Sequence, residues 1–173
     1  MTRVAIAAMS LALALALGAC GSGEDEAAAP KTAAAPLVLT APASDNDKAW
    51  KAYLQNIVGQ HMDSFTDRVY PYYLPVNSGV PTPGDLENKS NYDRQLENVK
   101  GVVDKTLLPR NLLAFGSPDS AKMADHVVAA FDGAKPEALQ GSQVLFIGKS
   151  ANSDRVKAAV EKAGAKFIFV EAK

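Results

Sequence analysis

The tripeptide Gly148-Lys149-Ser150 has the residue types that end a phosphate-binding loop. A complete loop of this kind needs a second glycine five positions before Gly148, because the backbone between the two glycines wraps around the phosphates. That position is Gln143, and residues 144–147 form an apolar run typical of a buried strand. We therefore exclude nucleotide hydrolysis by this motif.

A weaker kind of anion binding is still predicted around the same residues. Polar side chains follow two apolar runs, at 112–115 and 144–147, and comprise Ser117, Ser120, Lys149, Ser150 and Asn152. Ligands of parallel sheets favour the carboxyl ends of the strands, where helix N-termini present free N–H groups. We call these five residues the strand-end cluster and treat it as a candidate ligand- or anion-binding site. The alternative is that the serines and Asn152 only cap helices.

Two histidines could act as a base in a small enzyme. His61 lies on the apolar stripe of one predicted helix, and His126 lies beside Asp125 at the edge of the apolar face of another. The alternative is a packed, hydrogen-bonded histidine, and no nucleophile-elbow sequence accompanies either residue. Two histidines and one cysteine do not supply the usual ligands of a structural zinc site, and we predict no cofactor.

The segment 70–75 has the most unusual local composition, Tyr-Pro-Tyr-Tyr-Leu-Pro. Tyrosine offers amphipathic contact area at a low cost in conformational entropy. Tyr70, Tyr72 and Tyr73 are therefore a candidate partner surface on a predicted loop. The alternative is that the loop folds over the sheet and buries its rings.

Composition limits the classes of function. The chain has 173 residues, 47% hydrophobic and 21% charged, and a formal net charge of −1. This length suits one domain. A near-neutral protein has no electrostatic reason to bind nucleic acid. The single cysteine, Cys20, excludes an intramolecular disulfide.

The N-terminal residues predict export. Arg3 precedes an apolar run from Val4 to Leu17, which is shorter than the roughly 20 residues of a membrane-spanning helix. The run ends in Leu17-Gly18-Ala19-Cys20, which resembles the lipobox of bacterial lipoproteins. The resemblance implies cleavage after residue 19, a diacylglyceryl group on the Cys20 thiol and anchoring in a membrane. Gly21, in place of the aspartate that retains such proteins at the inner membrane, implies the outer membrane. The alternative is an unlipidated signal peptide with an incidental cysteine.

Residues 20–43 are predicted to form the lipidated N-terminus and a flexible tether. They are rich in Gly, Ser, Ala, Pro and acidic residues and have no periodic apolar face. The expected root-mean-square reach is about 25–30 Å. A single domain is predicted over residues 44–173.

The first part of this domain predicts two helices. One begins at Ser44 or Asp45 and carries an apolar stripe of Trp50, Leu54, Ile57, Val58, His61 and Phe65. The other begins after Ser90, carries Tyr92, Leu96, Val99 and Val103, and ends before Pro109.

The second part predicts a strand–helix–strand–helix–strand series. Its strands are at 112–115, 144–147 and 167–170, and Ser117-Pro118 begins the first connecting helix. Such strands are parallel with right-handed crossovers, and unbroken apolar runs indicate burial on both faces. We therefore predict a three-layer α/β domain with a small three-stranded parallel sheet, the two connecting helices on one face and the first two helices on the other.

Segments 112–133 and 144–170 also loosely resemble the halves of a SPOR domain. That resemblance implies binding to peptidoglycan glycan strands through an antiparallel sheet with one exposed face. The residues themselves favour a lipid-anchored envelope protein that is a non-catalytic binding module, with a small enzyme or a peptidoglycan-binding protein as the alternatives.

Overall fold

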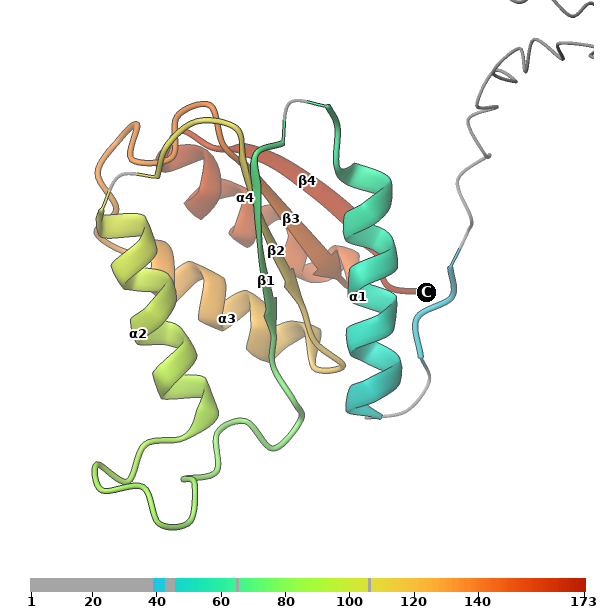
Figure 1. Ribbon diagram of the computed structural model, residues 1–173, viewed down its shortest axis with the longest axis vertical. Coiled ribbons are helices and arrows are strands. Elements are labelled where there is room, and N and C mark those ends of the chain that lie inside the picture. Colours follow the sequence, from blue (N-terminus) through green and yellow to red (C-terminus); the bar gives the residue numbers. More distant parts are fainter. Residues whose placement is uncertain (1–38, 43–45, 65, 106) are drawn as a thin grey trace, which may run out of the picture. The chain divides into compact units, whose positions relative to one another are not determined.

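The computed structural model describes residues 39–42, 46–64, 66–105 and 107–173, all within one compact unit, Pro36–Lys173. Cys20, the predicted signal peptide and most of the predicted tether lie outside the described residues. The described part contains four α-helices and one four-stranded sheet (Figure 1). In chain order the elements are α1 (Asp47–His61), β1 (Arg68–Tyr73), α2 (Asn91–Asp104), β2 (Asn111–Gly116), α3 (Ser120–Phe131), β3 (Gln143–Gly148), a 3-10 turn (Ser150–Asn152), α4 (Ser153–Lys162) and β4 (Lys166–Glu171).

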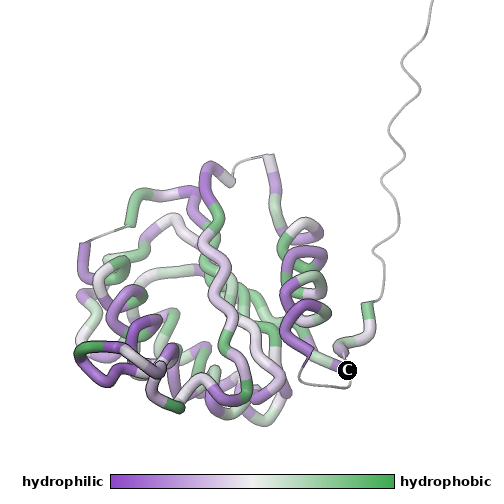
Figure 2. Tube along the Cα trace, turned by 60° about the horizontal axis from the view of Figure 1, so that its bottom comes forward, coloured by the Kyte–Doolittle hydropathy of each residue, from purple (hydrophilic) through white to green (hydrophobic). Residues whose placement is uncertain are grey.

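The sheet is parallel throughout, with the spatial order β1-β2-β3-β4. One face packs against α2, α3 and α4 around Phe115, Val127 and Phe146. The other face packs against α1, with Leu112 and Ile147 contributing from the strands. Hydrophobic residues follow the strands behind β1, whereas the helices alternate between hydrophobic and hydrophilic positions (Figure 2). The predicted three-layer α/β arrangement with parallel strands is therefore confirmed.

The predicted position of the second helix is wrong. We expected α1 and α2 on the same face, but Val99 and Val103 of α2 join the core formed by α3 and α4. The reason is the fourth strand: α2 connects β1 to its parallel neighbour β2, as α3 and α4 connect the following pairs. Right-handed crossovers between strands in sequential order place every connecting helix on the same face.

The predicted three-stranded sheet is wrong, because the sheet has a fourth strand: the segment 68–73, most of which we predicted as a loop, forms β1. β1 forms one edge of the sheet and pairs with β2 from Arg68↔Asn111 to Tyr73↔Gly116. The Leu74 N–H donates to the Gly116 carbonyl, so by alternation the backbone groups of Pro71 and Tyr73 face the free edge. Pro71, which has no N–H, therefore removes no bond from the ladder, and this is the position where strands tolerate proline.

Helix starts agree with the sequence at α2 and differ at α3. Ser90 caps α2 in a capping box, in which its side chain accepts from the Asp93 N–H and the Asp93 carboxylate accepts from the Ser90 N–H. At α3 the cap is Asp119, which accepts from the Lys122 N–H, and not the predicted Ser117. A side-chain oxygen in the Asp119 position reaches the free N–H groups of the first turn.

The first helix is capped by Asn46 and ends at His61. The predicted caps Ser44 and Asp45, and Phe65, lie outside the described residues. Before this helix, Leu39 and Ala41 pack on the α1 face of the core, and the Ala41 N–H donates to the Lys173 carbonyl. The packed part of the chain thus begins before residue 44. Nowhere in the described part is there a helix of the length and apolarity needed to span a membrane.

We predict that Ser90→Ala lowers the free energy of unfolding by about 1 kcal/mol, the usual cost of losing a side-chain N-cap. Urea denaturation measures this change. Ser153→Ala is the matched control, because Ser153 begins α4, whose N-cap makes no side-chain hydrogen bond. Equal changes for the two variants would show that the capping box does not stabilise α2.

Candidate functional site

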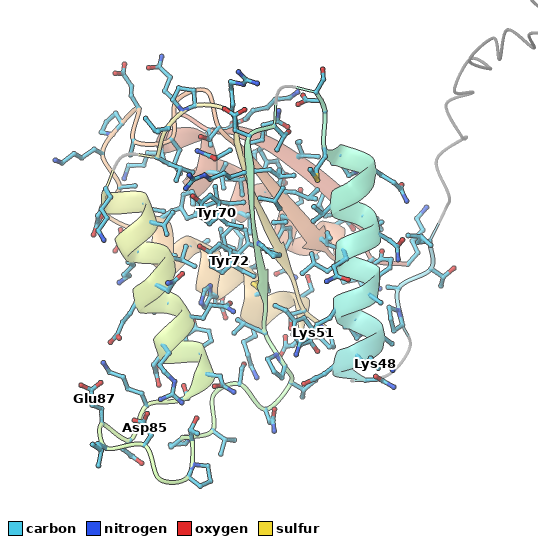
Figure 3. The ribbon with its side chains drawn as sticks, viewed as in Figure 1. Lys48, Lys51, Tyr70, Tyr72, Asp85 and Glu87 are labelled. Carbon is cyan, nitrogen blue, oxygen red and sulfur yellow. The ribbon has the colours of Figure 1, made fainter. Side chains whose placement is uncertain are left out.

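The larger of two hollows described on the domain is a cavity of about 770 Å³ between β1 and α2. We call it the β1–α2 cleft. Its β1 side consists of Asp67, Arg68 and Tyr70, and Tyr70 lies between the strand and the helix (Figure 3). Alternation along β1 directs Arg68, Tyr70 and Tyr72 to the α2 side of the sheet.

The α2 side of the cleft is one stripe of the helix. Asn98, Gly101, Val102 and Lys105 all line it, at the i, i+3, i+4, i+7 spacing of a single helical face. Gly101 leaves this face open: a Cβ built there meets no atom within 4 Å. The buried residues Val99 and Val103 attach the neighbouring stripe of α2 to the core. The helix therefore stays packed while the side that faces β1 is hollow.

The end of the cleft is closed by the connection between α2 and β2. Leu107, Leu108, Pro109 and Asn111 line it there, and Leu108 is 77% exposed. The Asn111 amide donates to the Leu108 carbonyl, which fixes the turn of this connection. The cleft thus has apolar walls and a polar rim, the composition typical of small-molecule sites.

The carboxylates on the rim have ion-pair partners, whereas two of the described cations do not. Asp67 pairs with Arg110 at 3.0 Å, and Glu97 pairs with Lys89 at 2.8 Å. Neither Arg68 nor Lys105 has an ion pair or a side-chain hydrogen bond among the described residues. Two unpaired cations therefore border the cleft, together with two carboxylates that already have cationic partners.

The second hollow, of about 470 Å³, lies at the other end of β1 and shares Asn98 with the cleft. Tyr72 and Tyr73 line it, but both are engaged. Tyr72 stacks on Phe115 at 4.9 Å, and burial, with a smaller contribution from Tyr70, raises its pKa to about 12. The Tyr73 hydroxyl donates to Asp47, and the Tyr73 carbonyl accepts from Gln95. Of the three tyrosines of the candidate partner surface, Tyr70 is the one that lines the cleft.

The structure brings most of the strand-end cluster together but uses it to join segments of the fold. The Ser120 hydroxyl accepts from the Lys149 N–H at 2.7 Å and from the Asn152 amide at 3.2 Å. The Lys149 ammonium donates to the Ala172 carbonyl, and the Ser150 N–H faces the carboxylate of Glu171. Ser117 is buried and donates to the Leu74 carbonyl.

These contacts hold loops to one another and are not helix caps: α3 is capped by Asp119, and no side-chain hydrogen bond caps the 3-10 turn or α4. A sheet in sequential strand order also has no reversal point at which a crevice opens between its strand ends.

The two histidines cannot form one catalytic site. His61 ends α1 and His126 lies in the middle of α3, and these helices pack on opposite faces of the sheet. His126 is fully buried, and neither of its ring nitrogens has a hydrogen-bond partner. Its ring meets Tyr92 edge-on at 5.0 Å, and burial lowers its pKa to about 4.

Two further expectations bear on ligands. Across the part of the chain that the structure covers, no group of three or more His, Cys, Asp or Glu side chains could hold a metal ion. The SPOR resemblance implied an antiparallel sheet with an exposed face, whereas this sheet is parallel and has helices on both faces. The expected fold of that family is therefore not the fold of this chain.

Among the residues that line the cleft, only Tyr70 stands out in the sequence as a candidate site residue. The available signals were weak: a glycine in the middle of an amphipathic helix, and Leu107-Leu108 between that helix and Pro109. Their meaning depends on a strand beside α2.

Comparisons with protein-family models, with curated proteins and with solved structures each find no match.

We predict that acid destabilises the domain through His126. Because its folded pKa is about 4 and its ordinary value is 6.5, the unfolded chain binds a proton more tightly. The contribution of the neutral His126 ring to the free energy of unfolding is complete above pH 6.5. It is lost as the pH falls towards 4, and the loss is on the order of 2–3 kcal/mol. Denaturation from pH 7 to pH 4 should show a smaller loss in His126→Leu than in the native chain. His61→Gln is the control, and a native slope in His126→Leu would contradict the assignment.

Proposed function

We propose that this chain is a lipid-anchored envelope protein. The support is the order of its first 20 residues: a short positive start, an apolar run of signal-peptide length, and Leu17-Gly18-Ala19-Cys20. A diacylglyceryl group gives two acyl chains on Cys20, and acylation of the new amine adds a third. Two or more chains anchor a protein stably, whereas one chain is marginal. Gly21 after the cysteine favours the outer membrane as the destination.

The folded domain is a non-catalytic binding module with the β1–α2 cleft as its binding site. The observation that carries this proposal is an open cavity of about 770 Å³ beside a helix face that has a glycine at its centre. Small-molecule sites span about 300–1,000 Å³ and combine apolar walls with a few polar groups. We favour binding over catalysis because no histidine lines the cleft and the buried ring of His126 cannot reach a substrate.

Cys20→Ser should remove the membrane-bound, processed form of the protein. Membrane fractionation followed by mass spectrometry of the N-terminal peptide measures both the location and the lipid mass. Ser22→Ala, two residues beyond the modified thiol, should leave both unchanged. A processed Cys20→Ser protein that still sediments with membranes would show that lipid on this residue is not the anchor.

Filling the cleft should abolish binding without unfolding the domain. Gly101→Leu places a side chain in the open space of the cleft, and Gly59→Leu does the same on the exposed face of α1. Both replacements should stabilise their helices by about 0.5–1 kcal/mol, since leucine is a better helix former than glycine. Affinity capture from membranes should therefore lose its co-purifying molecule with Gly101→Leu and keep it with Gly59→Leu. The same co-purifying molecule on both variants would place the binding site elsewhere.

A further inference from the structure

We infer that the β1–α2 cleft selects an amphipathic organic anion, which places its acidic group at Arg68 and Lys105 and its apolar body along Tyr70. This inference rests on the proposed function of the cleft as the binding site and adds the chemical class of the ligand. Its basis is the distribution of charge and apolar surface around one cavity.

The cationic groups are available. Arg68 is exposed at the first position of β1, and Lys105 is exposed at the C-cap of α2. They approach the same cavity from its two sides, and neither has a partner among the described residues. A guanidinium matches the planar geometry of a carboxylate or the tetrahedral face of a phosphate, and an ammonium adds a point charge.

The acidic groups are not available in the same way. Asp67 faces Arg110, and Glu97 shares Lys89 with Glu87, so that each carboxylate in the lining already has a cation within 3.0 Å. A cationic ligand would have to compete with these existing pairs and would meet Arg68 and Lys105. An anionic ligand meets two cations that have no competing partner.

The rest of the lining requires an apolar body. Tyr70 lies on the strand side of the cleft (Figure 3), and the lining also includes Val102 on the α2 side and Leu107 at the closed end. All three side chains are half-buried and belong to the surroundings of the larger core. A small inorganic ion would leave this surface uncovered, whereas an aromatic or aliphatic acid would cover it.

Three matched probes test the inference: naphthalene-2-acetate, 2-naphthyl phosphate and the neutral naphthalene-2-acetamide. They share one apolar body, and the first two separate a carboxylate ligand from a phosphate ligand. Titration of the isotope-labelled protein, followed by amide NMR shifts, reports both affinity and location. We expect at least one anion to shift the amides of Tyr70, Asn98 and Gly101, and to bind at least about tenfold more tightly than the amide.

Arg68→Gln should weaken binding of that anion about tenfold and leave the acetamide unchanged, and Lys105→Gln should act in the same direction. Lys100→Gln is the control, since Lys100 is exposed on the same helix and does not line the cleft. Equal binding of anion and acetamide in the cleft would overturn the anion inference and leave the binding site standing. An equal loss with Lys100→Gln would also overturn it, as general charge attraction. Failure of all three probes to shift cleft amides would overturn the inference and the proposed site together.

Discussion

The complete burial of β2 is the constraint on which the rest of the domain depends. Every residue from Asn111 to Gly116 is buried, and β3 is buried at five of its six positions. A strand in that position must have a paired strand on each side and a packed layer on each face, because its backbone and its side chains have no access to water. The four-stranded sheet and the helices on its two faces are the smallest set of elements that meets both requirements.

The order in which these elements follow one another determines where a site can form. Since each strand pairs with the next, all three connecting helices share a face and the strand ends form an even rim. The polar residues of that rim hold the loops to one another, as Ser120 does for Lys149 and Asn152. Open space arises instead at the margin of the sheet. There β1 is the last strand, and no further described element lies beyond β1 and α2. The cleft is therefore a product of the sheet ending at β1.

Sequence patterns predicted those parts of the fold in which a local signal and the tertiary role coincide. The apolar runs of β2, β3 and β4 and the Ser90 cap are of this kind, because burial and capping leave direct marks on residue type. β1 was missed because its three tyrosines and Pro71 have the composition of a loop. Its strand conformation depends on pairing with β2, which no residue of the segment encodes by itself. Because β1 was missed, α2 was also predicted on the wrong face of the sheet.

The candidate sites show the same limit. Ser120, Lys149 and Asn152 of the strand-end cluster lie together, but their residue type cannot show whether an internal partner has already engaged them. In the sequence, Arg68 and Lys105 are isolated cations with no pattern that connects them. They become a pair only when β1 lies beside α2, so that the site depends on a contact between elements far apart in the sequence.

Pro71 has a further consequence for the protein in a crowded compartment. A sheet margin exposes N–H and carbonyl groups that can recruit a strand from another molecule, and this is a common start of aggregation. Along β1 one outward N–H is missing at Pro71, and one outward carbonyl, that of Tyr73, is occupied by Gln95. The margin beside the cleft therefore offers an incoming strand an interrupted template. A second copy of the chain therefore gains little by extending the sheet there.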